Sequence, residues 1–155
     1  MTTIKKVLSV KDKKHIVTNV LHDLPEWFGL PESTQNYIDE SEFLDLYVLE
    51  IEQMVCGFIT LRETSKDTVE IHCMGIKKAF HRHGYGQALL NHVVNDLDAS
   101  YSFLQVKTVD EGHYKEYDQT IQFYEAMGFK RLEVFPNLWD EWNPCLLLVK
   151  SLKEK

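Results

Sequence analysis

Apolar side chains recur at helical spacing near the start of the chain. Within residues 9–24, four of them fall on one helix face: Ile16, Val20, Leu21 and Leu24. Ser9 precedes this stripe as a typical N-cap, and Pro25 interrupts it. Pro31 suits the first turn of a second helix over residues 31–41. We therefore predict two helices in the first 41 residues.

Strand-like patterns follow. Residues 42–63 are rich in Phe, Leu, Val, Ile and Tyr, and the polar "EIEQ" at 50–53 divides them into a hairpin. Residues 67–76 read as a third strand after the connection "ETSKD". The spacing then predicts alternating helices and strands, with a helix over 87–97, a strand over 101–109, a helix over 119–128 that Gly128 ends, and strands over 129–135 and 145–152.

The predicted order is α-α-β-β-β-α-β-α-β-β. Hairpins followed by strand–helix–strand alternation indicate an α/β (α+β) protein with a mixed sheet. The chain has 155 residues and contains neither repeats nor a linker rich in Pro, Gly or Ser. We therefore expect a single domain over residues 1–155.

Composition narrows the classes of function. The net charge of −7 disfavours nucleic acid as a partner, because its binding needs clustered basic residues. No apolar run is long enough to span a membrane, and the N-terminus lacks the pattern of a secretory signal. Three cysteines without a CxxC pair indicate small buried side chains in a reducing compartment rather than a metal site. We expect a cytoplasmic protein that binds neither membrane, nucleic acid nor metal.

One glycine-containing stretch, "HRHGYGQALL" at 81–90, follows the third strand and opens a helix. The first amides of a helix have no partner within the helix and attract anions, and glycine lets the backbone approach a phosphate closely. Basic residues flank the stretch, among them Lys77, Lys78 and Arg82. Taken alone, the two glycines are explained more simply by a tight strand-to-helix turn without a ligand. The third glycine of a dinucleotide fingerprint is absent, and so is the P-loop pattern.

The stretch "GIKKAFHRHGYGQALL" resembles the acyl-CoA-binding signature [Gln/Arg]-x-x-Gly-x-[Gly/Ala] of the GNAT superfamily of N-acyltransferases. Downstream, "IQFYEAMGFKRLE" resembles the family's F-Y-x-x-x-G-F element. The resemblance implies the GNAT fold, a mixed sheet of six to seven strands flanked by four helices, as in bacterial single-domain members. It also implies acetyl-CoA as co-substrate. Members often form homodimers, although no interface signal is legible here. The chain departs from the family pattern at His81 and at Tyr117, where Gln or Arg and Asn are usual.

The resemblance implies roles for individual residues. Loop amides would hold the pyrophosphate, and the third strand would pair with the pantetheine arm, with a backbone N–H near Met74 or Ile76 polarising the thioester. The cofactor-binding residues it implies are Met74, Ile76, His81, Arg82, His83, Gly84, Tyr85, Gly86, Gln87 and Tyr117. Tyr124 stands where many members carry the general acid for the CoA sulfur, or it packs beside Phe123 in the core.

Glu70 stands where several members carry the catalytic base. On a strand of period two it shares a face with His72 and Met74, so Glu70 and His72 could relay a proton. The alternatives are that Glu70 solvates the strand start and that His72 is a polar filler. Exposed aromatic residues in loops suggest acceptor binding, and together with His72 we predict this role for Trp27, Phe28, Trp139 and Trp142.

Four acidic residues provide candidates for attracting a cationic amine: Glu32, Glu111, Asp140 and Glu141. The sequence thus predicts an enzyme that acetylates a primary amine of a small molecule by direct attack in a ternary complex. Two alternatives stay open: acetylation of a protein or peptide, and a non-catalytic acyl-CoA-binding module.

Overall fold

The computed structural model describes residues 1–153, which form two compact units. The first unit comprises residues 1–62 and 72–97, and the second comprises 63–71 and residues from 98 onward. Seven strands make one mixed sheet in the order β1-β2-β3-β4-β5-β7-β6. The mixed α/β class and the mixed sheet of six to seven strands expected from the sequence are confirmed.

The first unit contains helices α1, α2 and α3 and the N-terminal strands. Its elements are β1 (Thr2–Val7), α1 (Val10–His22), α2 (Pro31–Glu40), β2 (Asp45–Ile51), β3 (Met54–Ser65, to Arg62), β4 (Thr68–Ile76, from His72) and α3 (Tyr85–Asp96). The Oγ of Ser9 accepts from the amide of Asp12 at 3.2 Å, so the predicted N-cap is confirmed.

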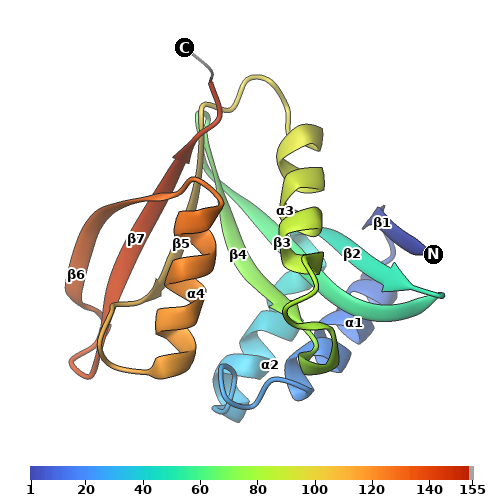
Figure 1. Ribbon diagram of the computed structural model, residues 1–155, viewed down its shortest axis with the longest axis horizontal. Helices are drawn as coiled ribbons and strands as arrows, with labels where there is room; N and C mark the ends of the chain where they lie inside the picture. The colour runs from blue at the N-terminus through green and yellow to red at the C-terminus, as the bar shows by residue number, and fades with distance from the viewer. Residues whose placement is uncertain (154–155) are drawn as a thin grey trace. The chain divides into compact units, whose positions relative to one another are not determined.

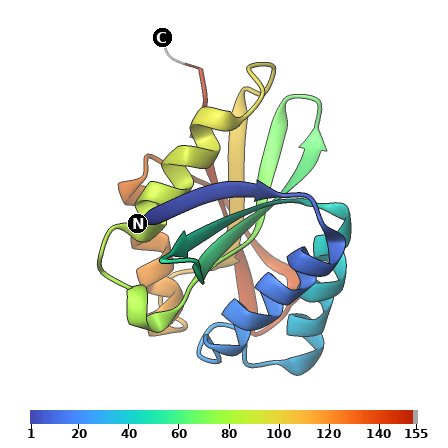
Figure 2. The same cartoon turned by 90° about the vertical axis from the view of Figure 1, so that its right-hand side faces the viewer.

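Alternation along β2 distributes its side chains between two layers of helices. Leu46 and Val48 join the core cluster that includes Ile16, Val20 and Leu21 of α1. The intervening Tyr47 faces α3, where its hydroxyl donates to the Asp96 carboxylate. Figure 2 shows α1 and α2 on one face of these strands and α3 on the other.

The second unit is built around β5. Its elements are the end of β3, the start of β4 (Thr68–Ile71), β5 (Phe103–Val109), α4 (Lys115–Ala126), β6 (Lys130–Asp140) and β7 (Asn143–Ser151). β5 pairs in parallel with β4 from Thr68–Phe103 to Ile71–Val106, and antiparallel with β7. Figure 1 shows α4 beside β5. The helix ends at Ala126, two residues before Gly128, whose φ of 94° is left-handed as expected of the glycine that stops a helix.

Three predictions about elements were wrong. The pattern missed β1, because its side chains are exposed except at Ile4 and Val7 and leave little apolar signal. Helix α4 begins at Lys115 rather than 119, within a polar stretch that reads as a loop. Residues 136–144 are mostly strand, since β6 continues to Asp140 and β7 begins at Asn143.

Candidate active site

The glycine turn connects β4 to α3 within the first unit. The Lys77 amide donates to the Cys56 carbonyl at 2.8 Å, which fixes the point where the chain leaves the sheet. Arg82 and Gly84 then adopt left-handed φ values of 64° and 80°. Such a conformation is costly for most residues, and glycine adopts it freely. Gly84 is the N-cap of α3, and its carbonyl accepts from the Ala88 amide at 3.0 Å.

The N-terminus of α3 is open around Gly84. A Cβ added to this glycine would meet no heavy atom within 4 Å, and no side chain caps the helix. Arg82 and His83 are exposed beside it. Amide donors, the helix dipole and a neighbouring guanidinium all favour an anion at this position.

His81 ties the glycine turn to the end of β4. Its Nε2 donates to the Ile76 carbonyl at 2.5 Å, and its ring meets the Trp27 ring edge-on at 5.7 Å. This nitrogen is thus engaged with the backbone. A phosphate contact from His81 would have to use the other ring nitrogen.

The linker between α1 and α2 braces the same turn. Asp23 accepts from the Lys78 amide at 2.8 Å, and Glu26 accepts from the Lys78 ammonium at 3.0 Å. The Lys78 contact lowers the pKa of Glu26 below its usual range. Of the basic residues around the glycines, Lys78 therefore already has an acidic partner.

The C-terminal part of β4 lies directly under α1. A Cβ at Gly75 would stand 3.0 Å from Leu24 and 3.1 Å from Val20, so only glycine fits without displacement. Met74 and Ile76, the predicted thioester-binding residues, flank this position and are partly exposed.

His72 faces α2. Its Nε2 lies 3.3 Å from a carboxylate oxygen of Glu40, within ion-pair distance. The Tyr37 ring meets the imidazole edge-on at 5.4 Å and the Phe28 ring at 5.8 Å. The structure thus brings together two predicted acceptor-binding residues, His72 and Phe28, and adds Tyr37 and Glu40 to them.

Glu70 lies in the second unit and is buried, with 3% of its surface exposed. Its Oε1 accepts from Gln105 at 3.0 Å and lies 3.1 Å from the Lys107 ammonium. Glu70 does not solvate the strand start, as one alternative held. Cys145 is buried nearby, and burial raises the pKa of its thiol to about 11.

Tyr124 is buried in α4, packed between two aromatic rings. The rings of Phe123 and Phe129 each lie 5.3 Å from the Tyr124 ring. The Tyr124 carbonyl accepts from the Phe129 amide at 3.0 Å, so the backbone of this residue is fixed as well as its ring. Tyr117, one of the predicted cofactor contacts, meets the Tyr114 ring edge-on at 5.8 Å.

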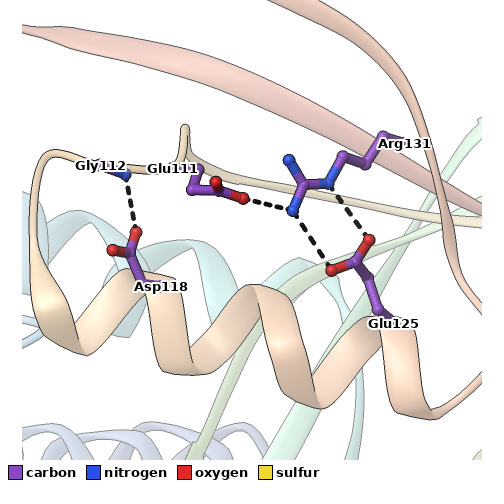
Figure 3. Close-up of polar contacts among 5 residues, drawn as sticks. All are labelled: Glu111, Gly112, Asp118, Glu125 and Arg131. Carbon is purple, nitrogen blue, oxygen red and sulfur yellow. Dashed lines mark hydrogen bonds and ion pairs between the residues drawn. The ribbon is translucent and has the colours of Figure 1, made fainter.

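A charged network fixes the loop before α4. Figure 3 shows the Arg131 guanidinium held by Glu111 at 2.5 Å and by Glu125 at 3.2 Å, while Asp118 accepts from the Gly112 amide at 3.0 Å. The two carboxylates raise the pKa of Arg131. Glu111, a candidate for attracting the acceptor amine, is therefore paired with a cation of its own unit.

Trp139 and Trp142 stand at the tip of the β6–β7 hairpin and are 47% and 71% exposed. Asp140 closes the tip by accepting from the amides of Trp142 and Asn143, each at 2.8 Å. The Asn143 side chain also donates to this carboxylate and lowers its pKa. The Asp140 carboxylate therefore fixes the turn of the hairpin, and the Trp139 and Trp142 side chains remain exposed to solvent.

Sequence reasoning missed the partners of Glu70 and His72 on β4. Tyr37 and Glu40 are spaced i, i+3, which places them on one face of α2, but nothing in the sequence indicates that this face meets His72. Gln105 and Lys107 alternate on β5, and a polar pair in a strand that is otherwise apolar was a signal for a buried partner.

A family model described as an acetyltransferase (GNAT) domain matches residues 42–131. This match covers more than half of the chain and includes both β4 and the glycine turn. The chain belongs to the GNAT superfamily of acetyl-CoA-dependent N-acetyltransferases.

Solved structures share the fold at low sequence identity. A GNAT family acetyltransferase from Elizabethkingia anophelis with acetyl-CoA bound is 18% identical, with a TM-score of 0.73 and 97% of each chain covered. The aminoglycoside 6'-N-acetyltransferase from Enterococcus faecium is 17% identical (TM-score 0.75, 99% of this chain, 98% of that one). The ribosomal-protein-S18-alanine N-acetyltransferase from Escherichia coli is 17% identical (TM-score 0.74, 100% of this chain, 96% of that one).

No curated protein sequence is significantly similar to this chain. Within residues 1–153, no helix has the length and apolar character needed to cross a membrane. The same residues contain no cluster of three or more His, Cys, Asp or Glu side chains arranged to hold a metal ion.

Proposed function

We propose that this protein transfers the acetyl group of acetyl-CoA to a primary amine of a small molecule, by direct attack within a ternary complex. The observation that carries the proposal is the path from β4 into α3: a strand, a left-handed glycine at an open helix N-terminus, and exposed basic side chains beside it. This arrangement suits a pyrophosphate.

The cofactor is proposed to lie along the first unit. The amides of residues 82–87 and the Arg82 side chain would hold the pyrophosphate, with His83, Tyr85 and Gln87 around it. The pantetheine arm would run beside His72–Ile76, the part of β4 that extends beyond its four residue pairs with β5. Strand-like pairing of an extended ligand with a backbone edge is a common mode of recognition. A backbone N–H at Met74 or Ile76 would then polarise the thioester carbonyl.

The chemistry requires two proton transfers besides carbon–nitrogen bond formation. The acceptor arrives as an ammonium and must lose a proton before its lone pair attacks the thioester carbon. When the carbon–sulfur bond breaks, the thiolate takes a proton. We propose Tyr124 as the donor, because a phenol is protonated at neutral pH and this residue occupies the tyrosine of the F-Y-x-x-x-G-F signature. The second proton of the amine nitrogen restores the phenol.

The acceptor class is proposed from exposed groups on this chain. Trp142 and Trp139 present aromatic faces that attract a cation. Phe28 and Trp27 add aromatic surface in the α1–α2 linker. Aromatic faces of this kind suit a compact organic amine that carries a positive charge. Acetylation of a protein amine is the second candidate, because one enzyme with this fold acts on a ribosomal protein.

The test follows the release of free thiol from acetyl-CoA over a panel of small amines and N-terminal peptides. Thiol release stimulated by small amines supports the proposal. A response limited to peptides would support the protein-acetylating alternative. Acetyl-CoA binding without any amine-stimulated release would identify a non-catalytic binding module.

A further inference from the structure

We infer that His72, held by Glu40, is the general base that removes the proton of the acceptor ammonium. This inference rests on the proposed acetyl transfer and names a catalytic residue for it. It arises from a cluster within the first unit, His72 on β4 and Tyr37 and Glu40 on α2, that the sequence did not predict.

The geometry is that of an imidazole beside a carboxylate. The Nε2 atom of His72 is itself buried and lies 3.3 Å from the Glu40 carboxylate, an ion-pair contact without hydrogen-bond alignment. A carboxylate beside one ring nitrogen favours the tautomer that carries its hydrogen there. The lone pair then resides on Nδ1, the nitrogen that accepts a proton.

The neighbouring groups hold the ring in place. The Tyr37 ring restricts the imidazole from the side, and Glu40 is 49% exposed, so solvent screens part of its charge. A general base must be neutral when it takes the proton, and histidine is the side chain that most often serves in this role. The His72 side chain is 13% exposed.

Glu70 is the carboxylate on this strand, and its surroundings favour a different role. The carboxylate already accepts from Gln105 and faces the Lys107 ammonium at 3.1 Å. Protonating Glu70 would leave Lys107 without its compensating charge. We therefore assign Glu70 to holding β4 and β5 in register, and the base to His72.

The proton balance is complete without another reactant. Neutral His72 takes one proton from the ammonium and releases it to solvent after turnover. The nitrogen then attacks the thioester carbon, the carbon–sulfur bond breaks, and the second amine proton replaces the one given to sulfur. The products are the N-acetyl amine, CoA thiol and one proton.

The test measures kcat/KM against pH for the wild type, H72Q, E40Q and E70Q, using an amine that the wild type acetylates and H15Q as an exposed histidine control. We expect an acid limb in the wild type that H72Q abolishes, with a loss of about 10²-fold near neutrality. The deficit of H72Q should narrow at high pH, where the amine arrives neutral. E40Q should move the limb to lower pH. E70Q and H15Q should retain it.

Persistence of the acid limb in H72Q would overturn the assignment, as would its loss in E70Q alone. Binding of acetyl-CoA, measured for each variant, shows that the site is folded. Absence of turnover in the wild type is a different result, because it would overturn the proposed function itself.

Discussion

The Lys107 ammonium lies 3.1 Å from the buried carboxylate of Glu70, and the two residues come from adjacent parallel strands. Glu70 pairs in register with Gln105, which donates to the same oxygen. A buried charge with two donors is tolerated, whereas one left alone is strongly destabilising.

Replacing Lys107 by Met should therefore destabilise the protein through Glu70. We expect K107M to lower the free energy of unfolding by roughly 2–3 kcal/mol, less than for a fully buried pair because Lys107 is 30% exposed. The double variant K107M/E70Q should recover much of the loss. Urea unfolding of both variants measures this coupling. Equal stability of K107M and the wild type would show that the pair contributes nothing.

Gly84→Glu should weaken CoA binding by at least about tenfold, since the new carboxylate stands where the phosphates are proposed to bind. Gly112→Glu is a matched control, because Gly112 also has a positive φ, 91°, and open space around its Cβ position. Calorimetric titration with CoA compares the two. An equal loss of affinity in both variants would contradict the phosphate site at Gly84, because backbone strain or net charge would then explain the effect of G84E.

Tyr124→Phe removes one oxygen and leaves the packing against Phe123 and Phe129 in place. We expect kcat to fall by about 10²-fold with CoA affinity unchanged, because only the proton donor is lost. Tyr101→Phe, which removes a hydroxyl bonded to Glu63, is the control for losing a phenol elsewhere in the same unit. Unchanged turnover in Y124F would contradict the role of Tyr124 as proton donor and would show that the residue serves only in packing.

The three cysteines should be unreactive in the folded protein. All are buried free thiols, and burial raises the pKa of Cys145 to about 11 and also raises those of Cys56 and Cys73. Unfolded thiols ionise near pH 8.5, so stability should fall as pH rises from about 8.5 towards 11. A chromogenic disulfide at pH 8 should label no thiol in the native state and three in denaturant. Rapid native labelling would contradict the burial.

Much of the fold was predictable because its core strands and helices carry strong apolar periodicity. Single residues or short stretches were enough to predict the Ser9 cap, the turn at Glu52–Gln53 and the glycine that follows the end of α4, Gly128. Edge strand β1 was not, since only one face of it packs and Lys5 and Lys6 are exposed.

The candidate site was predictable where one continuous segment builds it. The glycine turn can be recognised from the sequence because Arg82, Gly84 and the start of α3 are neighbours along the chain. The partners of His72 and Glu70 come from α2 and β5, which are distant in sequence. Only the fold therefore reveals that His72 lies beside Glu40 and Glu70 beside Lys107.

The central claim is that this chain moves an acetyl group from acetyl-CoA to an amine. The most direct measurement incubates the wild type and G84E with acetyl-CoA and the amine panel, and quantifies both free CoA thiol and N-acetyl product by mass spectrometry. We predict equimolar thiol and acetylated amine for the wild type and a strongly reduced yield of both for G84E at limiting acetyl-CoA. Thiol release without an acetylated product, or no product from any amine or peptide, would contradict the account.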